Sequence, residues 1–390
     1  MPSHSRRQLL TLLGAATVGL AGCQSSGRPS GEFDAVDGDW PTEGANPRRT
    51  RRVASGPTEP ETVWTTQLDD ARGAGSPSIA DSRVYALADA VSDRARHRYR
   101  LHALDARTGE ERWRVPLRSD PNGSPAVGAN RIVVSAQRGI EQGRLVAVEA
   151  EYGDEQWLFD VDARVTASPT VDGRWVYLPD WDGTVHALSV TDGAVRWSRQ
   201  IGADDTNHTF AIPAAVDGDT VFLGSLSGWT GLVAVDAATG AMRWSRSTPR
   251  VVSGPAVDDG LVVVQAGDLL VGFDTDGTER WTFAVPGGDR ASKLALDEQH
   301  VYVATQDALV AVGRDGGHSW TYEFTSERGG PPTVVDGEVL VYDDGLTAVG
   351  RDDGQRRWTV DSEGGGDVVA TPAAVFTTGS GGQIFAMGAD

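Results

Sequence analysis

Eight tryptophans recur along the chain at nearly regular intervals, and this spacing restricts the possible folds more than any other feature. Successive members lie 49, 44, 40, 47, 37, 39 and 38 residues apart, at Trp64, Trp113, Trp157, Trp197, Trp244, Trp281, Trp320 and Trp358. Each interval contains short runs of alternating apolar residues separated by turn residues, as in residues 168–197. Such runs are typical of short strands joined by tight hairpins. Four strands in every repeat of about 40 residues predict the blades of a β-propeller.

The repeats share the pattern A-x-D-x-x-T-G-x-x-x-W, which is complete from Ala103 to Trp113 and from Ala234 to Trp244. The pattern predicts a turn in which the Asp side chain accepts hydrogen bonds from the following backbone, while Gly adopts a left-handed conformation. The small Ala leaves room on the third strand. We therefore interpret all eight tryptophans as structural anchors that dock against a neighbouring blade, each burying about 200 Å², rather than as ligand platforms.

Seven repeats are complete, and the two ends of the chain supply the eighth. Residues 371–387 contain three strand-like runs and then stop, and the missing fourth run matches residues 62–65. Pairing the two ends closes the ring and removes its exposed edges. The sequence thus predicts an all-β, eight-bladed β-propeller of four-stranded antiparallel blades over residues 58–390, with one blade closed by the N- and C-terminal segments.

The first residues are typical of an export signal rather than of a folded domain. Arg6 and Arg7 stand in the order S-R-R-x-Φ-L of a twin-arginine signal. The apolar run from Leu9 to Leu20 would be about 18 Å long as a helix, too short to cross a hydrocarbon core of about 30 Å. Cys23 ends an L-A-G-C sequence that resembles a lipobox, whose Cys is lipidated.

These signals divide the N-terminal part of the chain. We expect residues 1–22 to be a signal peptide, and residues 23–57 to be a flexible tether and lead-in, because the stretch through Asp39 is rich in Gly, Ser and Asp without periodicity. Twin-arginine export carries folded proteins. A lipid on Cys23 would then hold the exported protein on the outer face of the cytoplasmic membrane.

The charge balance excludes several classes of protein. Acidic residues outnumber basic ones by 55 to 35, a formal net charge of −20, which argues against nucleic-acid binding because contacts to phosphates need clustered cations. A single Cys excludes a disulfide scaffold and a Cys-ligated zinc or iron–sulfur site. Lys293 is the only lysine. Many carboxylates with almost no lysine predict a halophilic protein; an acidic protein from a GC-rich genome is the alternative.

The A-x-D-x-x-T-G-x-x-x-W pattern resembles the tryptophan-docking motif of the pyrroloquinoline quinone (PQQ)-like repeat superfamily, over roughly residues 58–390. Trp40-Pro41 and the residues that follow also resemble the segment preceding such propellers in envelope proteins of halophilic archaea. The superfamily includes eight-bladed quinoprotein alcohol dehydrogenases and the non-enzymatic lipoprotein of the bacterial outer-membrane assembly machine. The resemblance implies a fold and not a function, because the motif serves blade packing.

The enzymes of that superfamily carry features that this chain lacks. Their quinone lies under a disulfide between adjacent cysteines, beside Ca²⁺ held by a Glu/Asn/Asp set, whereas Cys23 is alone and no cluster here matches that set. The resemblance therefore implies a chain without catalytic residues or cofactor. A quinoprotein oxidoreductase that binds PQQ and calcium in the axial channel is the alternative.

A long polar loop at residues 202–210 is the best candidate for a small-ligand pocket. Loops between an outer strand and the next inner strand line one mouth of a propeller channel, where ligands commonly bind. Two tryptophans on neighbouring hairpin tips would complete the pocket. The candidate residues are Asp204, Asp205, His208, Trp181 and Trp229. An ordinary surface loop is the alternative.

Two further surface features follow from local spacing. Four arginines alternate with other residues, so that a strand would place them on one face; they are Arg94, Arg96, Arg98 and Arg100. This stripe would dock an anionic partner or pair with carboxylates of the next blade. Asn122 and Asn207 begin N-x-S/T sequons, which are glycosylation sites where the host glycosylates exported proteins.

No metal site is expected. The D-x-D-G runs at residues 180–183 and 274–277 resemble the start of a calcium loop but lack the Glu at its twelfth position, so we interpret them as hairpin turns. The acidic residues are spread over the blade turns rather than gathered at one site. The sequence therefore predicts a non-catalytic, membrane-anchored module outside the cytoplasmic membrane that binds an envelope protein or a surface polymer.

Overall fold

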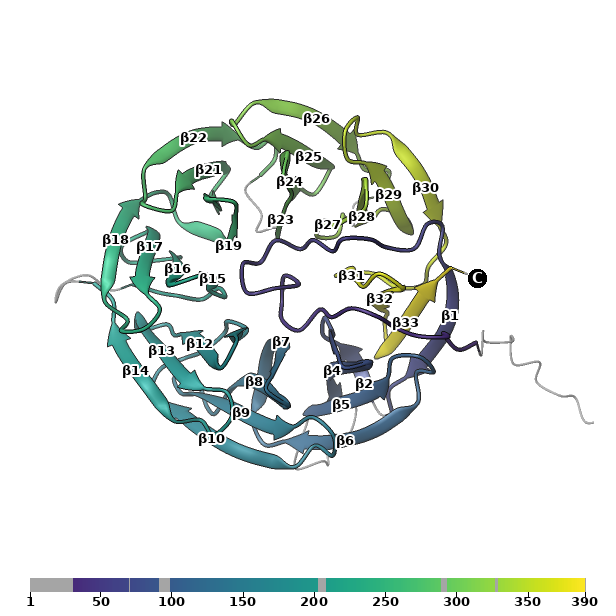
Figure 1. The fold of residues 1–390 in the computed structure, drawn as a ribbon, viewed down its shortest axis with the longest axis horizontal. Helices are drawn as coiled ribbons and strands as arrows, with labels where there is room; N and C mark the ends of the chain where they lie inside the picture. The colour runs from purple at the N-terminus through teal and green to yellow at the C-terminus, as the bar shows by residue number, and fades with distance from the viewer. Residues whose placement is uncertain are drawn as a thin grey trace, which may run out of the picture.

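The computed structural model describes residues 31–69, 71–90, 99–202, 208–288, 293–326 and 329–389. Within these ranges the chain forms eight antiparallel sheets arranged as blades around a central axis (Figure 1). No helix in the described part of the chain is long and apolar enough to span a membrane. The predicted all-β, eight-bladed propeller is confirmed.

Blades 1 to 7 follow one another along the chain. Blade 1 consists of β2 (Ala71–Ala74), β3 (Ser78–Ala80), β4 (Arg83–Ala90), β5 (Tyr99–Asp105) and β6 (Glu111–Leu117). Blade 2 consists of β7 (Asp120–Gly128), β8 (Arg131–Gln137), β9 (Gly143–Glu149) and β10 (Glu155–Val161). Blade 3 consists of β11 (Thr170–Asp172), β12 (Trp175–Pro179), β13 (Thr184–Ser189) and β14 (Val195–Gln200). Blade 4 consists of β15 (Ala215–Asp217), β16 (Thr220–Ser225), β17 (Gly231–Asp236) and β18 (Met242–Ser247).

The remaining blades repeat this order up to the point of closure. Blade 5 consists of β19 (Val251–Asp258), β20 (Leu261–Ala266), β21 (Leu269–Asp274) and β22 (Glu279–Ala284). Blade 6 consists of β23 (Leu294–Leu296), β24 (His300–Ala304), β25 (Ala308–Gly313) and β26 (His318–Glu323). Blade 7 consists of β27 (Thr333–Val335), β28 (Glu338–Tyr342), β29 (Leu346–Gly350) and β30 (Arg356–Val360). The closing blade consists of β31 (Val369–Ala370), β32 (Ala374–Thr378), β33 (Gln383–Gly388) and β1 (Glu61–Gln67).

Closure of the ring joins the two ends of the chain. Strand β1 pairs antiparallel with β33, with Trp64 opposite Ala386 and Thr65 opposite Phe385. The outer strand predicted at residues 62–65 therefore completes the blade that the C-terminal strands begin. Because β1 covers the free edge of β33, the closing sheet has four strands, as blades 2 to 7 have, whereas blade 1 has a fifth strand because both β2 and β3 pair with β4.

The eight tryptophans lie on the fourth strands, and seven of them dock in the same way. The indole nitrogen donates a hydrogen bond to a backbone carbonyl of the next blade, in the turn that joins that blade's last two strands. For Trp64 the acceptor is the Ala106 carbonyl, at 3.0 Å. The equivalent bonds of Trp113, Trp157, Trp197, Trp244, Trp281 and Trp320 measure 2.8–3.1 Å. The indole of Trp358 instead donates to the Glu338 carboxylate of its own blade, at 3.1 Å.

The exception at Trp358 follows from the closure. Its neighbour is the closing blade, in which β33 ends at Gly388 and the fourth strand is β1 from the other end of the chain. No continuous turn joins the third and fourth strands there, so the docking carbonyl is missing and a carboxylate takes its place.

The small residues of the repeat have a packing reason. Gly109, in the turn of blade 1, has φ of 72°, and a Cβ there would lie 2.6 Å from the Trp64 ring. The turn therefore needs Gly both for its backbone conformation and for the close approach of the indole. Ala103 lies directly opposite Trp113 in the register of β5 and β6, next to a bulge in the pairing. Asp105 Oδ1 accepts hydrogen bonds from the Arg107 and Thr108 amides at 2.9 and 3.1 Å.

Residues 31–60, which we call the lead-in segment, run from the rim across the centre of the ring and back (Figure 1). The segment bonds to the first strand of one blade after another. The backbone bonds join Trp40 to Ile79, Pro41 to Val127, Pro47 to Val216, Arg48 to Val257, Thr50 to Leu296, and Arg51 and Val53 to Val334. The lead-in segment thus lies across the centre of the ring, bonded to the first strands of six blades.

The beginning of the lead-in segment differs from the flexible tether predicted through Asp39. From Gly31 onward the chain lies against the ring, and Phe33 and Val36 are buried. The Phe33 amide donates to the Arg107 carbonyl at 3.0 Å, which attaches the segment to blade 1. Phe33 and Val36 belong to the same buried apolar cluster as Trp40 and Trp64.

Candidate functional site at the propeller axis

Five charged side chains meet at the axis of the ring. Glu43, Arg49 and Arg51 come from the lead-in segment, Lys293 directly precedes β23 of blade 6, and Asp367 precedes β31 of the closing blade. Their side chains are 10%, 7%, 2%, 31% and 8% exposed, in that order. Burial of this many charges requires that they pair with one another, since an isolated buried charge is costly.

The single lysine of the chain joins the two carboxylates. Lys293 Nζ lies 3.3 Å from Glu43 Oε1 and in short contact with Asp367 Oδ2. Glu43 Oε1 is also 3.4 Å from Arg49 Nη2, and Glu43 Oε2 accepts a short hydrogen bond from the Ser168 hydroxyl of blade 3. The network therefore connects the lead-in segment to three blades.

Arg51 attaches the lead-in segment to the seventh and closing blades. Its guanidinium donates to the Pro332 carbonyl at 2.7 Å, to Thr333 Oγ1 at 3.0 Å and to the Val368 carbonyl at 3.2 Å. The guanidinium carbon also lies 5.3 Å from the centre of the Trp40 ring, within the range of a cation–π contact. These contacts hold Arg51 at a φ of 49°, a left-handed conformation that a residue with a side chain rarely adopts.

The environment favours the charged forms of Glu43, Asp367 and Lys293. Burial would raise the pKa of Glu43, but Lys293 and Arg49 outweigh it and hold that pKa far below its usual value. Burial likewise opposes ionisation of Asp367, whose pKa Lys293 and Arg51 lower. The pKa of Lys293 is raised, because Glu43 and Asp367 outweigh the effect of its burial.

The five side chains form a buried ion-pair network. Three cations face two carboxylates, so neither Glu43 nor Asp367 is left as a free base or metal ligand. In the described ranges, no group of three or more His, Cys, Asp or Glu side chains is placed to hold a metal ion. The residues at the axis therefore do not fit the calcium set that a quinone site would need.

The residues predicted for a ligand pocket are only partly described. Asp204 and Asp205 lie outside the described residues. His208 is buried, and its ring lies 4.9 Å from Trp229 and 5.6 Å from Phe210. Trp181 donates its indole hydrogen to Thr166 at 2.7 Å and packs under the Arg164 guanidinium, 4.3 Å from its carbon.

The other predicted surface residues are placed as follows. Arg94, Arg96 and Arg98 lie outside the described residues, as do Arg6, Arg7, Cys23 and Asn207. Arg100 lies on β5, where its guanidinium donates to the Asp69 carbonyl at 3.5 Å. Asn122 lies on β7, and its amide nitrogen, the atom that would carry a glycan, donates to the Val165 carbonyl at 2.8 Å.

The first D-x-D-G run forms a turn. Asp180 Oδ1 accepts hydrogen bonds from the Asp182 and Thr184 amides at 3.0 and 2.9 Å. Asp180 Oδ2 lies 3.1 Å from His186 Nε2, and His186 Nδ1 lies 2.9 Å from the Ser198 hydroxyl. The aspartate thus uses both oxygens within blade 3.

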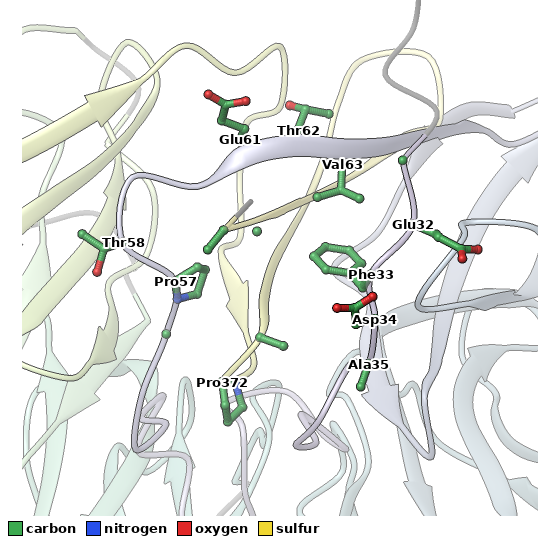
Figure 2. A pocket seen from close by; sticks show the side chains of 15 residues that line it. Glu32, Phe33, Asp34, Ala35, Pro57, Thr58, Glu61, Thr62, Val63 and Pro372 are labelled. Atoms are coloured by element: carbon green, nitrogen blue, oxygen red, sulfur yellow. The ribbon is translucent and has the colours of Figure 1, made fainter.

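A hollow of about 850 Å³ opens where the closing blade lacks its turn (Figure 2). Figure 2 shows Phe33 and Asp34 on one wall and Pro57 on the other. Among the residues that the structure describes, the lining includes the carboxylates of Glu32, Asp34 and Glu61 and no Arg or Lys. The hollow is therefore a consequence of closing the ring with two chain ends, rather than a gathering of convergent functional groups.

Sequence reasoning missed the axial network. We expected the acidic residues to be spread over the blade turns, yet Glu43 and Asp367 meet at the centre. One signal was present, because a chain that uses Arg almost everywhere retains a single Lys, at position 293. Lysine offers a compact point charge on a flexible stem, which suits a site between two carboxylates.

Comparison with known proteins gives the family and the fold. The family model described as "Outer membrane protein assembly factor BamB" matches residues 49–264, 206–292 and 269–390, most of the chain. The serine/threonine-protein kinase AfsK of Streptomyces griseus is 33% identical over 153 residues, which cover 35% of this chain and 17% of the kinase. The chain spans 17% to 42% of the length of the curated relatives it matches.

Two solved structures share the architecture. BamB from Moraxella catarrhalis superposes with a TM-score of 0.68 at 19% identity, covering 85% of this chain and all of that one. The quinohemoprotein alcohol dehydrogenase of Comamonas testosteroni gives 0.73 at 14% identity, covering 91% of this chain and 81% of that one. At these identities the structures establish a common fold. Together with the family model, they show that the chain belongs to the BamB-like family of PQQ-like-repeat β-propellers.

Proposed function

We propose that the protein is a non-catalytic, membrane-anchored β-propeller outside the cytoplasmic membrane, which acts as a binding or scaffold module for envelope partners. One observation carries the proposal. The lead-in segment lies across the axis, where Glu43 and Asp367 are already paired with the chain's own cations. A quinoprotein oxidoreductase would need that channel, with free ligands for calcium, for its cofactor.

The family supports a binding role. Its model bears the name of an outer membrane protein assembly factor, which favours an envelope protein as the partner of this chain, with a surface polymer as the second kind. The rigid ring of docked tryptophans suits such a role, because it presents loops and strand edges without needing to move. We expect no nucleic acid, metal or cofactor among its partners.

The N-terminal signals support the location. Arg6 and Arg7 would direct export, and a lipid on Cys23 would anchor the mature chain. Seven residues lie between Cys23 and Gly31, where the lead-in segment meets the ring, so the two are eight Cα–Cα steps apart. A chain of that length reaches at most about 28 Å. Anchoring would thus keep the propeller close to the membrane surface.

Two measurements test the proposal. Fractionation of cells that express the full chain should find the wild type with the membrane and the Cys23→Ala variant released; a variant that stays with the membrane contradicts the lipid anchor. Titration of the mature chain with PQQ, with and without Ca²⁺, should give no saturable tryptophan quenching and no dye reduction with alcohols. Calcium-dependent quenching with dye reduction would identify a quinoprotein oxidoreductase instead.

A further inference from the structure

The two arginines of the axial network share their carboxylates with Lys293. Arg49 Nη2 lies 3.4 Å from Glu43 Oε1, and Arg51 Nη2 lies 3.6 Å from Asp367 Oδ1. Lys293 Nζ contacts both of these carboxylates. Within the described ranges, neither arginine forms an ion pair with any other carboxylate. The five side chains therefore sum to a charge of +1.

Each of these arginines also has a nitrogen without an acceptor. Arg49 donates through Nη1 to the Glu43 carbonyl at 3.2 Å and through Nη2 to Glu43 Oε1 at 3.4 Å. Its Nε is buried and has no hydrogen-bond partner among the described residues. The hydrogen bonds that Arg51 makes within the described ranges use Nε and Nη2, and none uses Nη1. Because a buried N–H without an acceptor is destabilising, the axis lacks an acceptor near the two guanidiniums.

The two guanidiniums lie close enough to repel each other. Burial is the main cause that lowers the pKa of Arg51; Asp367 and Glu43 oppose it, and the charge of Arg49 adds to it. Water cannot screen this repulsion well, because the two arginine side chains are only 7% and 2% exposed. Two like charges held together at a buried site are stabilised by an anion near both of them.

Blade 5 leaves a small space beside the unpaired nitrogen of Arg49. A Cβ added to Gly254 would lie 3.1 Å from Arg49 Nε and 3.2 Å from the Pro213 carbonyl. No side chain therefore closes off Nε on the side of Gly254, and the Pro213 carbonyl bounds the space on another side. A space of this size holds a single atom or a water rather than a sulfate or a phosphate.

We propose that the axial network binds one monatomic anion, a halide such as chloride, beside Arg49 and Arg51. The halide supplies the acceptor that Arg49 Nε lacks and balances the charge of the five side chains. Hydrogen bonds between a guanidinium and an anion are charge-assisted and therefore stronger than those to a neutral acceptor. Lys293 is 31% exposed, so solvent reaches the network at its ammonium group. The site requires neither the lipid anchor nor a partner, so it stands or falls separately from the proposed function.

Urea denaturation of the mature chain tests the proposal, at constant potassium concentration and with chloride replaced stepwise by gluconate, which is too large for the site. We expect the free energy of unfolding to rise with the logarithm of the chloride concentration, with a limiting slope of one bound chloride per molecule. Arg49→Gln removes the unpaired N–H and one positive charge, so its slope should fall to near zero. Arg357→Gln is the matched control and should keep the wild-type slope, because Arg357 lies on β30 and pairs with Asp353.

A wild-type slope near zero would overturn the proposal, and so would an equal slope in Arg49→Gln, which would indicate a general salt effect. Anomalous diffraction from wild-type crystals soaked in bromide needs no variant and covers the case in which Arg49→Gln does not fold. A bromine peak beside Arg49 Nε supports the site. A water at that position, or bromine peaks found only on the surface, overturns it.

Discussion

Removal of the single lysine should destabilise the propeller from its centre. Lys293→Met keeps the length of the side chain but deletes the charge that joins Glu43 and Asp367. Both carboxylates are about nine-tenths buried, with 10% and 8% exposure, so water cannot replace the ammonium. Breaking a buried ion pair by removing one partner costs about 3–5 kcal/mol.

The expected loss lies at the lower end of that range. Lys293 is itself 31% exposed, and Arg49 and Arg51 remain near the carboxylates after the substitution. We therefore expect the free energy of unfolding to fall by about 3 kcal/mol. Lys293→Arg keeps the charge and should cost clearly less. Urea denaturation at constant high KCl measures both variants. Equal losses for Met and Arg, or no loss for Met, would refute the role of the charge.

The dependence on pH separates charge from packing. The pKa values of Glu43 and Asp367 are lowered in the folded state, so their stabilisation is present above about pH 4 and is lost as the pH falls through the lowered values. The pKa of Lys293 is raised, so its stabilisation is present below about pH 10 and is lost as the pH rises through the raised value. The difference between the wild type and Lys293→Met should therefore be largest near neutral pH and shrink below pH 4. A difference that stays constant from pH 7 to pH 3 would indicate lost packing.

Three further predictions concern the ring and its solvent. Gly109→Ala should lower the free energy of unfolding by several kcal/mol, because its Cβ would lie 2.6 Å from the Trp64 ring. Gly173→Ala is the control, because Gly173 has a φ of 56° and nothing within 4 Å, and it should cost about 1–2 kcal/mol. Equal losses of the two variants in urea denaturation would contradict the packing argument. Deletion of the mature chain through Leu68 should open the ring and lower its calorimetric melting temperature, and an unchanged melt would contradict closure by β1. If the protein is halophilic, dialysis into dilute buffer should unfold or aggregate it. An unchanged cooperative melt in dilute buffer would contradict the halophilic prediction.

The fold could be predicted because the residues that determine each blade recur within every repeat. The tryptophan spacing gives the blade length, and in blades 1 to 7 the small residue opposite each indole is an Ala or Gly nine or ten positions before that Trp. The closing strand could be recognised from Trp64, since it carries the same alternation as the outer strands of complete blades. These features depend on neighbours within one repeat.

The axial network could not be predicted in this way. Glu43 and Asp367 come from opposite ends of the chain, and nothing in the local sequence of either indicates the other. The lead-in segment has no period, because its backbone follows the first strands of successive blades rather than forming a strand of its own. Its arginines divide between the axial network and the ion pairs with Asp258 according to blades that lie up to 282 residues away, the separation of Arg51 and Thr333.

The order of contacts along the lead-in segment has a consequence for how such a protein can evolve. From Trp40 to Val53 the segment bonds to the first strands of blades 1, 2, 4, 5, 6 and 7 in the order of the blades themselves, so a few of its residues correspond to each of these six blades. Insertion or loss of one residue there would shift every later contact by one position. Duplication of a blade, the usual route by which repeat proteins grow, would leave the new blade without bonding residues in the lead-in segment. Lengthening the ring by a blade would therefore also require a matching insertion in the lead-in segment.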